Sequence, residues 1–303
     1  MTQEIYDVLV IGEGISGLTA AGELAKAGLK TATLEAQLFG GLVINVNELE
    51  PGPQEREVSG AEFAAELMQA NAELGVTSIQ EAVTAIASRD GLLHASTADS
   101  GYAARQIVAA SGARLRKLGV PGEDEFEGRG VSQCADCDGP MYQNEQVVVA
   151  GGGDSALQEA LVLANYCSAV RIIHRGGKFR AQPHYIEAVA ANSRISTTWN
   201  ATIEDIGGNK MVERVRVRHA DGRSEEIPCA GVFAYIGLVP NADYLPREVA
   251  CDAAGCAITD DHLQTALPGL WAIGAVRSGY GGTLPEAMDE ARCVAAAIRA
   301  RLT

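Results

Sequence analysis

A short apolar run that leads directly into a glycine-rich turn is the feature that most constrains the fold of this chain. Residues 6–11 have the pattern of a buried strand, the loop 12–17 reads Gly-Glu-Gly-Ile-Ser-Gly, and a helix is predicted over 18–27. In such a turn the first glycine makes the bend, the second lets the backbone approach phosphate oxygens, and the third lets helix and strand pack closely. The next strand, 31–34, ends in Glu35, at about the 20-residue offset where an acid binds ribose hydroxyls. The pattern therefore predicts a dinucleotide site.

The same arrangement recurs in the middle of the chain. A strand is predicted over 146–150, the loop begins Gly151-Gly152-Gly153, and a helix follows over 156–166. The paired strand, 169–173, ends in His174-Arg175 rather than in an acid. A cation at this place suits the 2′-phosphate of NADP, which an acid would repel. The chain thus carries two nucleotide loops with different ribose preferences.

These repeats predict an α/β protein made of two Rossmann-like dinucleotide-binding domains, the first discontinuous in sequence. Residues 106–113 and 232–237 both have the pattern of a strand ending in a glycine turn, and they are interpreted as the two crossings between domains. The first domain is expected to span 1–113 and 240–303, and the second 114–239. A chain of 303 residues is long enough for two such cores.

Cys134 and Cys137 form a vicinal dithiol just ahead of the second glycine loop. Such a pair can close a small disulfide ring and reopen it by thiol–disulfide exchange, and the motif usually lowers the pKa of one sulfur. A zinc site would need a second pair of ligands at similar spacing, which Cys251 and Cys256 do not supply. Redox chemistry is therefore favoured over a metal or structural role, and no metal site is predicted. The remaining cysteines sit among apolar residues and are expected to be core residues: Cys167, Cys229 and Cys293.

Charge and hydropathy exclude several classes of partner. The formal net charge of −15 argues against nucleic acid and against anionic membranes, because an acidic surface repels both. The apolar runs are shorter than the about 20 residues that span a bilayer, and the first residues lack a signal-peptide pattern. An odd number of cysteines, seven, fits a reducing cytoplasm.

Taken together, the motifs resemble the low-molecular-weight thioredoxin reductases over essentially the whole chain. A dithiol placed in the nicotinamide domain, rather than near the first loop, is peculiar to that family. The residues that carry the resemblance are, in chain order, Gly12, Gly14 and Gly17; Gly40-Gly41; Gly128-Arg129-Gly130-Val131-Ser132 leading to Cys134 and Cys137; Gly151-Gly152-Gly153; His174-Arg175 with Phe179-Arg180-Ala181; and Ile236-Gly237 with Pro240-Asn241.

The resemblance implies an enzyme that passes electrons from NADPH through FAD and the dithiol to a thioredoxin-like protein or a small disulfide. It also implies a homodimer and a rotation that alternately presents nicotinamide and dithiol to the flavin. By position, Cys137 would face the flavin and Cys134 would attack the external disulfide. Asp138 would donate or accept the proton, a role that calls for a partly buried carboxyl with a raised pKa. The alternative for Asp138 is a helix N-cap ahead of Gly139-Pro140.

The resemblance assigns cofactor sites residue by residue. The FAD site would comprise Gly12, Gly14, Ser16, Gly17, Glu35, Gly41, Leu42, Asn47, Ser111, Gly112, Gly274, Ala275, Thr283 and Leu284. The NADP site would comprise Gly153, Asp154, Ser155, Ala156, His174, Arg175, Arg180 and Gly237.

The chain departs from the family at several of these positions. The family has Gly-Asp where this chain has Gly274-Ala275, so a hydrogen bond to flavin hydroxyls is missing. Glu13 stands between the first two glycines, where a carboxylate is expected to repel pyrophosphate. Both changes should loosen FAD.

Further departures change the nicotinamide site, the flavin site and the dithiol. Gly176 replaces the second of two arginines, which leaves Arg175 and Arg180, with Lys178, for the 2′-phosphate. The Arg-Gln pair beside the flavin is replaced around Thr283, where Thr283-Leu284-Pro285-Glu286 still has the spacing of a capping box. Asp136 adds a negative charge between the cysteines, which tends to raise a thiol pKa.

Three functions remain open at this point. The first is the reductase, with NADPH or, because of Gly176, with NADH or ferredoxin as donor. The second is a dithiol oxidase that returns electrons to oxygen. The third is a flavin-binding redox sensor with little turnover.

Overall fold

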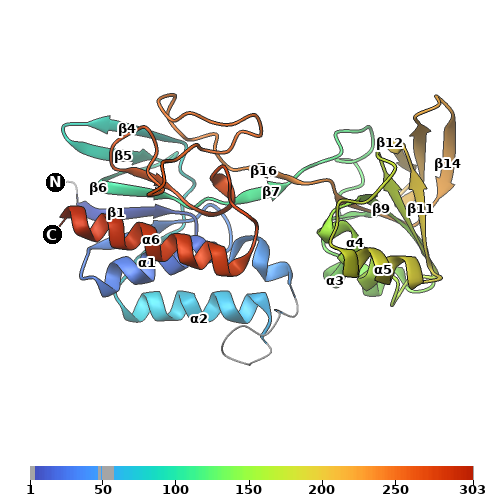
Figure 1. The fold of residues 1–303 in the computed structure, drawn as a ribbon, viewed down its shortest axis with the longest axis horizontal. Coiled ribbons are helices and arrows are strands. Elements are labelled where there is room, and N and C mark those ends of the chain that lie inside the picture. The colour runs from blue at the N-terminus through green and yellow to red at the C-terminus, as the bar shows by residue number, and fades with distance from the viewer. Residues whose placement is uncertain (1–3, 47–48, 50–57, 303) are drawn as a thin grey trace. The chain divides into compact units, whose positions relative to one another are not determined.

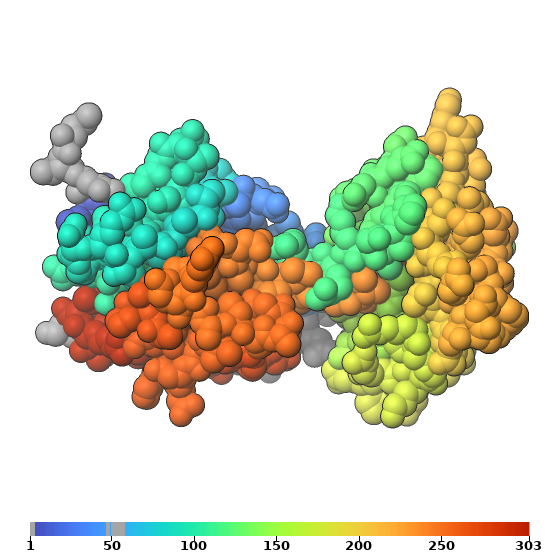
Figure 2. All heavy atoms as spheres, turned by 90° about the horizontal axis from the view of Figure 1, so that it is seen from above, coloured from blue at the N-terminus to red at the C-terminus, as the bar shows by residue number. Residues whose placement is uncertain are grey.

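The computed structural model of the chain describes residues 4–46, 49 and 58–302. The chain divides into two compact units: unit 1 comprises 1–114 and 239–303, and unit 2 comprises 115–238. Figure 2 shows blue-to-cyan and orange-to-red segments gathered into one body, and green-to-yellow segments into another. None of the described helices is long and apolar enough to cross a bilayer.

Unit 1 is a sheet of parallel strands extended by an antiparallel hairpin. Its strand order is β3-β2-β1-β6-β5-β4, and β17 also pairs in parallel with β6. The far half of β6 pairs with β17 because β5 covers only its first half. The elements are β1 (Ile5–Ile11), α1 (Ile15–Lys26), β2 (Thr31–Leu34), the 3-10 helix η1 (Gly41–Asn45), α2 (Gly60–Glu73), β3 (Thr77–Ile79), β4 (Ala85–Arg89), β5 (Leu92–Ser96), β6 (Gly101–Ala109), β17 (Leu270–Ala272), the 3-10 helix η3 (Gly274–Val276) and α6 (Leu284–Leu302).

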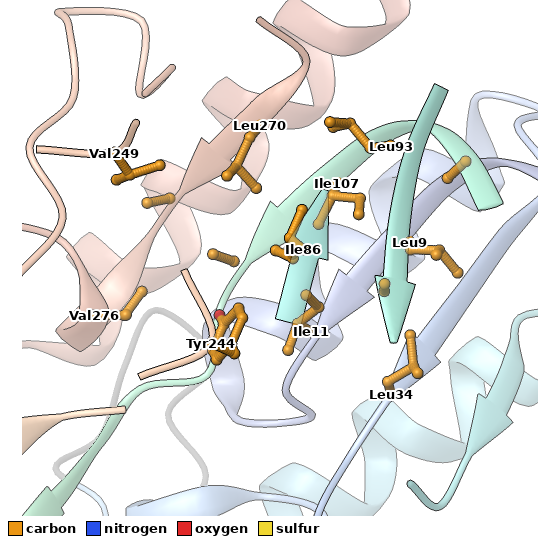
Figure 3. Close-up of a cluster of buried hydrophobic side chains, with 14 of the residues drawn as sticks. Leu9, Ile11, Leu34, Ile86, Leu93, Ile107, Tyr244, Val249, Leu270 and Val276 are labelled. Carbon is orange, nitrogen blue, oxygen red and sulfur yellow. The ribbon is translucent and has the colours of Figure 1, made fainter. Parts of the chain in front are cut away.

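Side chains of the unit 1 sheet alternate between two apolar layers, as strand geometry requires. On β1, Leu9 and Ile11 enter the layer that Figure 3 shows. Val8 and Val10 enter the opposite layer, which α1 and α6 cover with residues such as Leu24. Burial of each such side chain stabilises the fold by about 1.5–3 kcal/mol. In Figure 1, α1 and α6 lie next to each other on this face.

Unit 2 is a second parallel sheet, of order β11-β10-β9-β15-β8. On β9, Val147 and Val149 pack against α4 and α5, whereas Val148 and Ala150 pack against the antiparallel sheet β12-β13-β14. The elements are β8 (Val131–Ser132), α3 (Ala135–Asp138), the 3-10 helix η2 (Gly139–Tyr142), β9 (Gln146–Gly151), α4 (Asp154–Leu163), β10 (Ala169–His174), α5 (Pro183–Ala191), β11 (Ile195–Trp199), β12 (Ala201–Gly208), β13 (Val212–His219), β14 (Ser224–Pro228) and β15 (Gly231–Tyr235).

The two chain crossings between units lie side by side. They are the short strands β7 (Ala113–Leu115) and β16 (Leu238–Pro240), which pair with each other. The predicted fold class, α/β with two Rossmann-like units of which the first is discontinuous in sequence, is confirmed by this architecture.

Candidate active site

The first glycine loop has little room at two of its glycines and open space at the third. Gly12 has φ 104°, and a Cβ there would lie under 3.0 Å from the Ala110 backbone. A Cβ on Gly17 would overlap the Gly12 carbonyl oxygen, whereas at Gly14 the nearest atom would be 3.9 Å away. Gly14 is the N-cap of α1 and offers no side-chain cap to its first N–H groups. An N-terminus of this kind, open and uncapped, fits a dinucleotide pyrophosphate.

Neighbouring segments bring further predicted FAD residues to this loop. Gly14 forms an isolated β-bridge with Gly40, and a Cβ on Gly41 would lie 3.5 Å from the Gly14 Cα. Gly274 lies against the Ser16 side chain. The structure thus gathers Gly14, Ser16, Gly41 and Gly274, while Leu42 is exposed on η1. Asn47 lies outside the described residues.

The two acids at this loop hold the backbone. Glu35 accepts the Glu13 N–H at 2.7 Å and the Gln37 N–H at 2.9 Å. The Glu13 side chain is only 2% exposed and accepts hydrogen bonds from Thr33 and, at 2.6 Å, from Ser78. The Glu13 carboxylate is therefore directed to two hydroxyl donors, and its effect on pyrophosphate stays a prediction.

Ser111 and Gly112 follow β6 and contact the returning segment. The Ser111 hydroxyl donates to the Asn241 carbonyl at 2.7 Å and lies 2.9 Å from the Tyr244 hydroxyl. Tyr244 is buried, and burial raises its pKa. Gly112 has φ 63°, and a Cβ there would meet nothing within 4 Å. The sequence did not indicate a role for Tyr244, because its partner Ser111 is 133 positions away in the chain.

A buried ion pair supports the loop that carries Ala275. Glu290 on α6 accepts the Gly274 N–H at 2.7 Å and pairs with Arg277 through both Nε and Nη2. Ala275 is half-buried in this loop. The acid that the family places at 275 is therefore absent, and a different carboxylate, Glu290, holds the backbone beside it.

The predicted capping box at the start of α6 is only half formed. The Thr283 hydroxyl accepts the Glu286 N–H at 3.4 Å, which confirms Thr283 as a cap ahead of Leu284. The Glu286 carboxylate instead accepts the Gly281 N–H at 2.8 Å. The backbone of the glycine pair before Thr283 is thus hydrogen-bonded by a side chain from the first turn of α6.

The second glycine loop also combines packed and open positions. A Cβ on Gly152 would strike the His174 ring, whereas at Gly153, the N-cap of α4, nothing lies within 4 Å. The Asp154 carboxylate accepts the Gln182 N–H at 2.7 Å, which holds the 178–182 segment against the loop. The open, uncapped N-terminus of α4 fits a second pyrophosphate. Ser155 and Ala156 lie in its first turn, Ser155 exposed and Ala156 buried.

The residues predicted to bind the 2′-phosphate differ in exposure: one is buried and the others are exposed. His174 is 6% exposed, and its Nε2 lies 3.0 Å from the Lys178 carbonyl oxygen, so it supports the loop. Arg175 and Arg180 are both exposed. Gly237, with φ 107°, lies where β15 leads into β16. Beside His174, the rings of Phe179 and Trp199 are in tilted contact with centroids 4.4 Å apart, a contact that the sequence did not reveal.

Cys134 and Cys137 form a disulfide bond in the structure. Cys134 caps the one-turn helix α3, its N–H donates to Ser132 Oγ at 3.1 Å, and the Cys137 N–H donates to Cys134 Sγ at 3.1 Å. Cys137 is exposed and Cys134 is half-buried. A disulfide between these two cysteines is what redox chemistry requires. Cysteines joined in a disulfide cannot serve as thiolate ligands of zinc. Among the described residues, no group of three or more His, Cys, Asp and Glu is arranged to hold a metal ion.

The other cysteines are free thiols. Cys167 and Cys229 are buried, as predicted, and burial raises their pKa values to about 11 and about 12, which keeps them protonated and unreactive. The prediction for Cys293 was wrong, because this residue lies on the exposed side of α6.

Asp138 lies half-buried directly after the disulfide, and its N–H donates to the Cys134 carbonyl at 3.1 Å. It precedes the 3-10 helix η2, but its side chain makes no capping hydrogen bond there. The N-cap alternative is therefore not what the structure shows, and the carboxyl remains available for proton transfer.

A second carboxyl, Glu159 on α4, contacts the redox turn and was missed from the sequence. The Ala135 N–H donates to Tyr235 Oη at 3.1 Å and to Glu159 Oε2 at 3.3 Å. The Tyr235 hydroxyl donates to the same Glu159 oxygen at 3.3 Å. Burial raises the pKa of Glu159, and the negative charge of Asp136 adds to the effect.

Comparison with known proteins agrees with this site. The chain matches the model of the pyridine nucleotide-disulphide oxidoreductase family over residues 6–291, and it belongs to that family. It is 39% identical to thioredoxin reductase of Treponema pallidum over 275 residues, which cover 90% of this chain and 89% of the relative. Listeria monocytogenes thioredoxin reductase is 35% identical over 278 residues, 91% of this chain and 87% of that one.

Solved structures extend the likeness to three dimensions. The crystal structure of Lactococcus lactis thioredoxin reductase matches with a TM-score of 0.91 at 35% identity, covering 97% of each chain. That of the T. acidophilum enzyme matches with a TM-score of 0.91 at 28% identity, covering 99% of each. The chain is an FAD-dependent disulfide oxidoreductase whose second cofactor is NADPH.

Proposed function

We propose that this chain reduces the disulfide of a thioredoxin-like protein or a small molecule, with NADPH as donor and the Cys134–Cys137 pair as the last relay. The observation that carries the proposal is the disulfide itself, formed in a turn packed against the α4 of a nucleotide-binding unit. Bound FAD would supply the two-electron relay between nicotinamide and disulfide. The names of the relatives in Treponema and Listeria support thioredoxin as the partner.

The two cysteines take successive roles in the exchange. The Cys134 thiolate attacks one sulfur of the substrate disulfide, which forms a mixed disulfide and releases the other substrate sulfur as a thiolate. The Cys137 thiolate then attacks Cys134 Sγ, which restores the intramolecular disulfide and frees the second substrate sulfur. Two protons complete the substrate thiols, and the proposal assigns one of these transfers to Asp138, which lies half-buried directly after the disulfide.

The two cofactors are assigned to separate parts of the chain. FAD is proposed to bind residues 1–113 with 240–303, through the open positions at Gly14 and Gly112 and with Ser111 beside them. NADPH is proposed to bind 114–239, through Gly153 at the start of α4 and the exposed Arg175 and Arg180. The NADPH site and the dithiol are thus proposed to lie in the same unit.

Arg175→Ala is expected to raise the KM for NADPH about fivefold to tenfold, the effect of losing one exposed charge-assisted contact to phosphate. The KM for NADH should stay nearly unchanged, because NADH has no 2′-phosphate. Steady-state kinetics with both donors measures this. Lys210→Ala, which removes an exposed cation elsewhere in unit 2, is the matched control. Equal effects on both donors would show that Arg175 is structural.

Ala275→Asp is expected to strengthen FAD binding by up to about 1.5–3 kcal/mol, because a carboxylate there can accept a hydrogen bond from the flavin side chain. The Glu290–Arg277 pair leaves no unpaired carboxylate in that loop to oppose it. Fluorescence titration of the apoprotein with FAD measures the change. Ala275→Asn controls for shape, and Glu13→Gln should give no gain, because the Glu13 carboxylate is directed inward.

An anaerobic titration of the purified protein with NADPH, followed by absorbance, tests the function as a whole. Prompt bleaching of the flavin supports the reductase. Bleaching by dithiols but not by NADPH would replace it with a dithiol oxidase, and bleaching by reduced ferredoxin or NADH alone would change the donor. A preparation that holds flavin but turns over little with any of these donors would leave the redox sensor.

We further propose a homodimer in the cytoplasm that engages neither nucleic acid nor membranes. Five free cysteines support a reducing compartment, and the net charge of −15 opposes anionic partners. Light scattering during gel filtration tests the dimer, which a monomer mass at micromolar concentration would overturn.

A further inference from the structure

Glu159 is attached to the redox turn at the peptide that follows Cys134. Its Oε2 atom accepts the Ala135 N–H and the Tyr235 hydroxyl, both at 3.3 Å, and these two donors are 3.1 Å apart. Three elements, α4, β15 and α3, therefore meet at one carboxylate oxygen. Ala135 itself is fully buried, so water does not compete for its N–H.

One charged group and two hydrogen-bond donors act on the ionisation of this carboxyl. Burial raises the pKa of Glu159, and Asp136 on α3 raises it further, whereas the hydrogen bonds from the Ala135 N–H and from the Tyr235 hydroxyl on β15 lower it. Burial also raises the pKa of Tyr235, so this phenol remains a neutral donor. Protonation of Glu159 therefore removes the negative charge from the Ala135 amide.

We propose that Glu159 is a positioning residue of the redox centre whose charge acts, through the Ala135 amide, on the Cys134–Cys137 couple. The ionised carboxylate draws the Ala135 N–H toward itself and opposes a thiolate in the same turn. Neutralising it stabilises the thiolate and so favours the reduced pair. This role rests on the proposed function, because it concerns the same dithiol.

The electron and proton balance defines what is measured. Reduction of the disulfide takes up two electrons and breaks the S–S bond, and it takes up two protons to give two thiols, or one where a thiolate persists. An ionised Glu159 beside that thiolate binds a proton more tightly after reduction than before. At low pH Glu159 is protonated in both states and has no effect. As the pH rises through its titration, its charge increasingly favours the disulfide.

The test is the redox equilibrium of Cys134–Cys137 in the parent and in Glu159→Gln, at pH 5 to 9 without NADPH. The flavoprotein is equilibrated with dithiothreitol buffers, and the two thiols are counted by alkylation and peptide mass spectrometry. We expect equal equilibrium constants at the acid end. Above the Glu159 titration, the variant should favour the reduced pair about tenfold, which corresponds to about 30 mV. The rate of iodoacetamide alkylation should show a lower thiol pKa in the variant.

Two further variants isolate the charge from the structure. Tyr235→Phe removes a donor but keeps the carboxyl, so its equilibrium constant should still change with pH, with the midpoint shifted upward because the Tyr235 hydrogen bond lowers the pKa of Glu159. Glu187→Gln neutralises an exposed carboxylate on α5 and should match the parent throughout. An offset in Glu159→Gln that is constant with pH, or no offset at all, overturns the inference. A parent whose cysteines do not cycle would overturn the proposed function and this inference with it.

Discussion

Cys134→Ser and Cys137→Ser are each expected to lower disulfide reductase activity by at least about a thousandfold, because exchange needs one attacking and one resolving sulfur. The two variants should differ in absorbance. Cys137→Ser should also lose any thiolate–flavin charge-transfer band, since Cys137 is the sulfur proposed to face the flavin. Turnover is measured with NADPH and a thioredoxin, and the band by anaerobic reduction.

Cys293→Ser provides the matched control for these variants. Cys293 is exposed and free on α6, so its replacement should leave both turnover and flavin absorbance unchanged. Near-native turnover in either Cys134→Ser or Cys137→Ser would show that the disulfide is structural. It would also remove the observation on which the proposed function rests.

Replacing Gly17 and Gly14 by alanine should affect different properties, the stability of the fold at Gly17 and the binding of FAD at Gly14. A Cβ on Gly17 would overlap the Gly12 carbonyl oxygen, and the backbone there is enclosed, so the variant should lose about 3 kcal/mol of stability or fail to fold. Gly14 has φ −72°, which alanine adopts freely, and its Cβ would meet only Gly40 O at 3.9 Å. Gly14→Ala should therefore fold but bind FAD weakly, because the methyl group occupies the space proposed for pyrophosphate.

Thermal unfolding of the two apoproteins, together with FAD titration, distinguishes these effects. Gly101→Ala controls for adding a methyl group outside the site, since Gly101 does not have a positive φ and its Cβ would lie 4.0 Å from the Ala95 carbonyl oxygen. A Gly14→Ala protein that binds FAD as the parent does would place the pyrophosphate elsewhere.

Local sequence predicted the parts of the fold that local chemistry determines. The strands around both glycine loops lie where their apolar runs predicted them, at 5–11 and 146–151 in the structure. The first helix begins at Ile15 rather than at residue 18, because the turn of the loop is already helical after Gly14. The antiparallel sheet β12-β13-β14 was not predicted, since its pairing depends on partners in other strands.

Site residues were predictable only where a motif carried them. The dithiol and the open glycines are visible as spacing in the sequence. The inward orientation of Glu13 is not, because it requires Ser78, 65 positions away. Nor is the contact of Glu159 with Tyr235, 76 positions away. The charge of Glu13 is visible in the sequence, but the donors that surround its carboxylate are not, and the expectation that Glu13 opposes phosphate stays a prediction.

The discontinuity of unit 1 sets an order of events at the ribosome. Residues 115–238 leave the exit tunnel before residues 239–303, so the unit encoded in the middle of the chain is the first whose elements are all available. Until then β6 lacks β17, and α1 lacks α6 to cover its apolar face. At about 5–20 residues per second this interval lasts on the order of several seconds. A nascent chain halted before residue 270 should therefore hold a folded dithiol unit while its flavin unit is still unfinished.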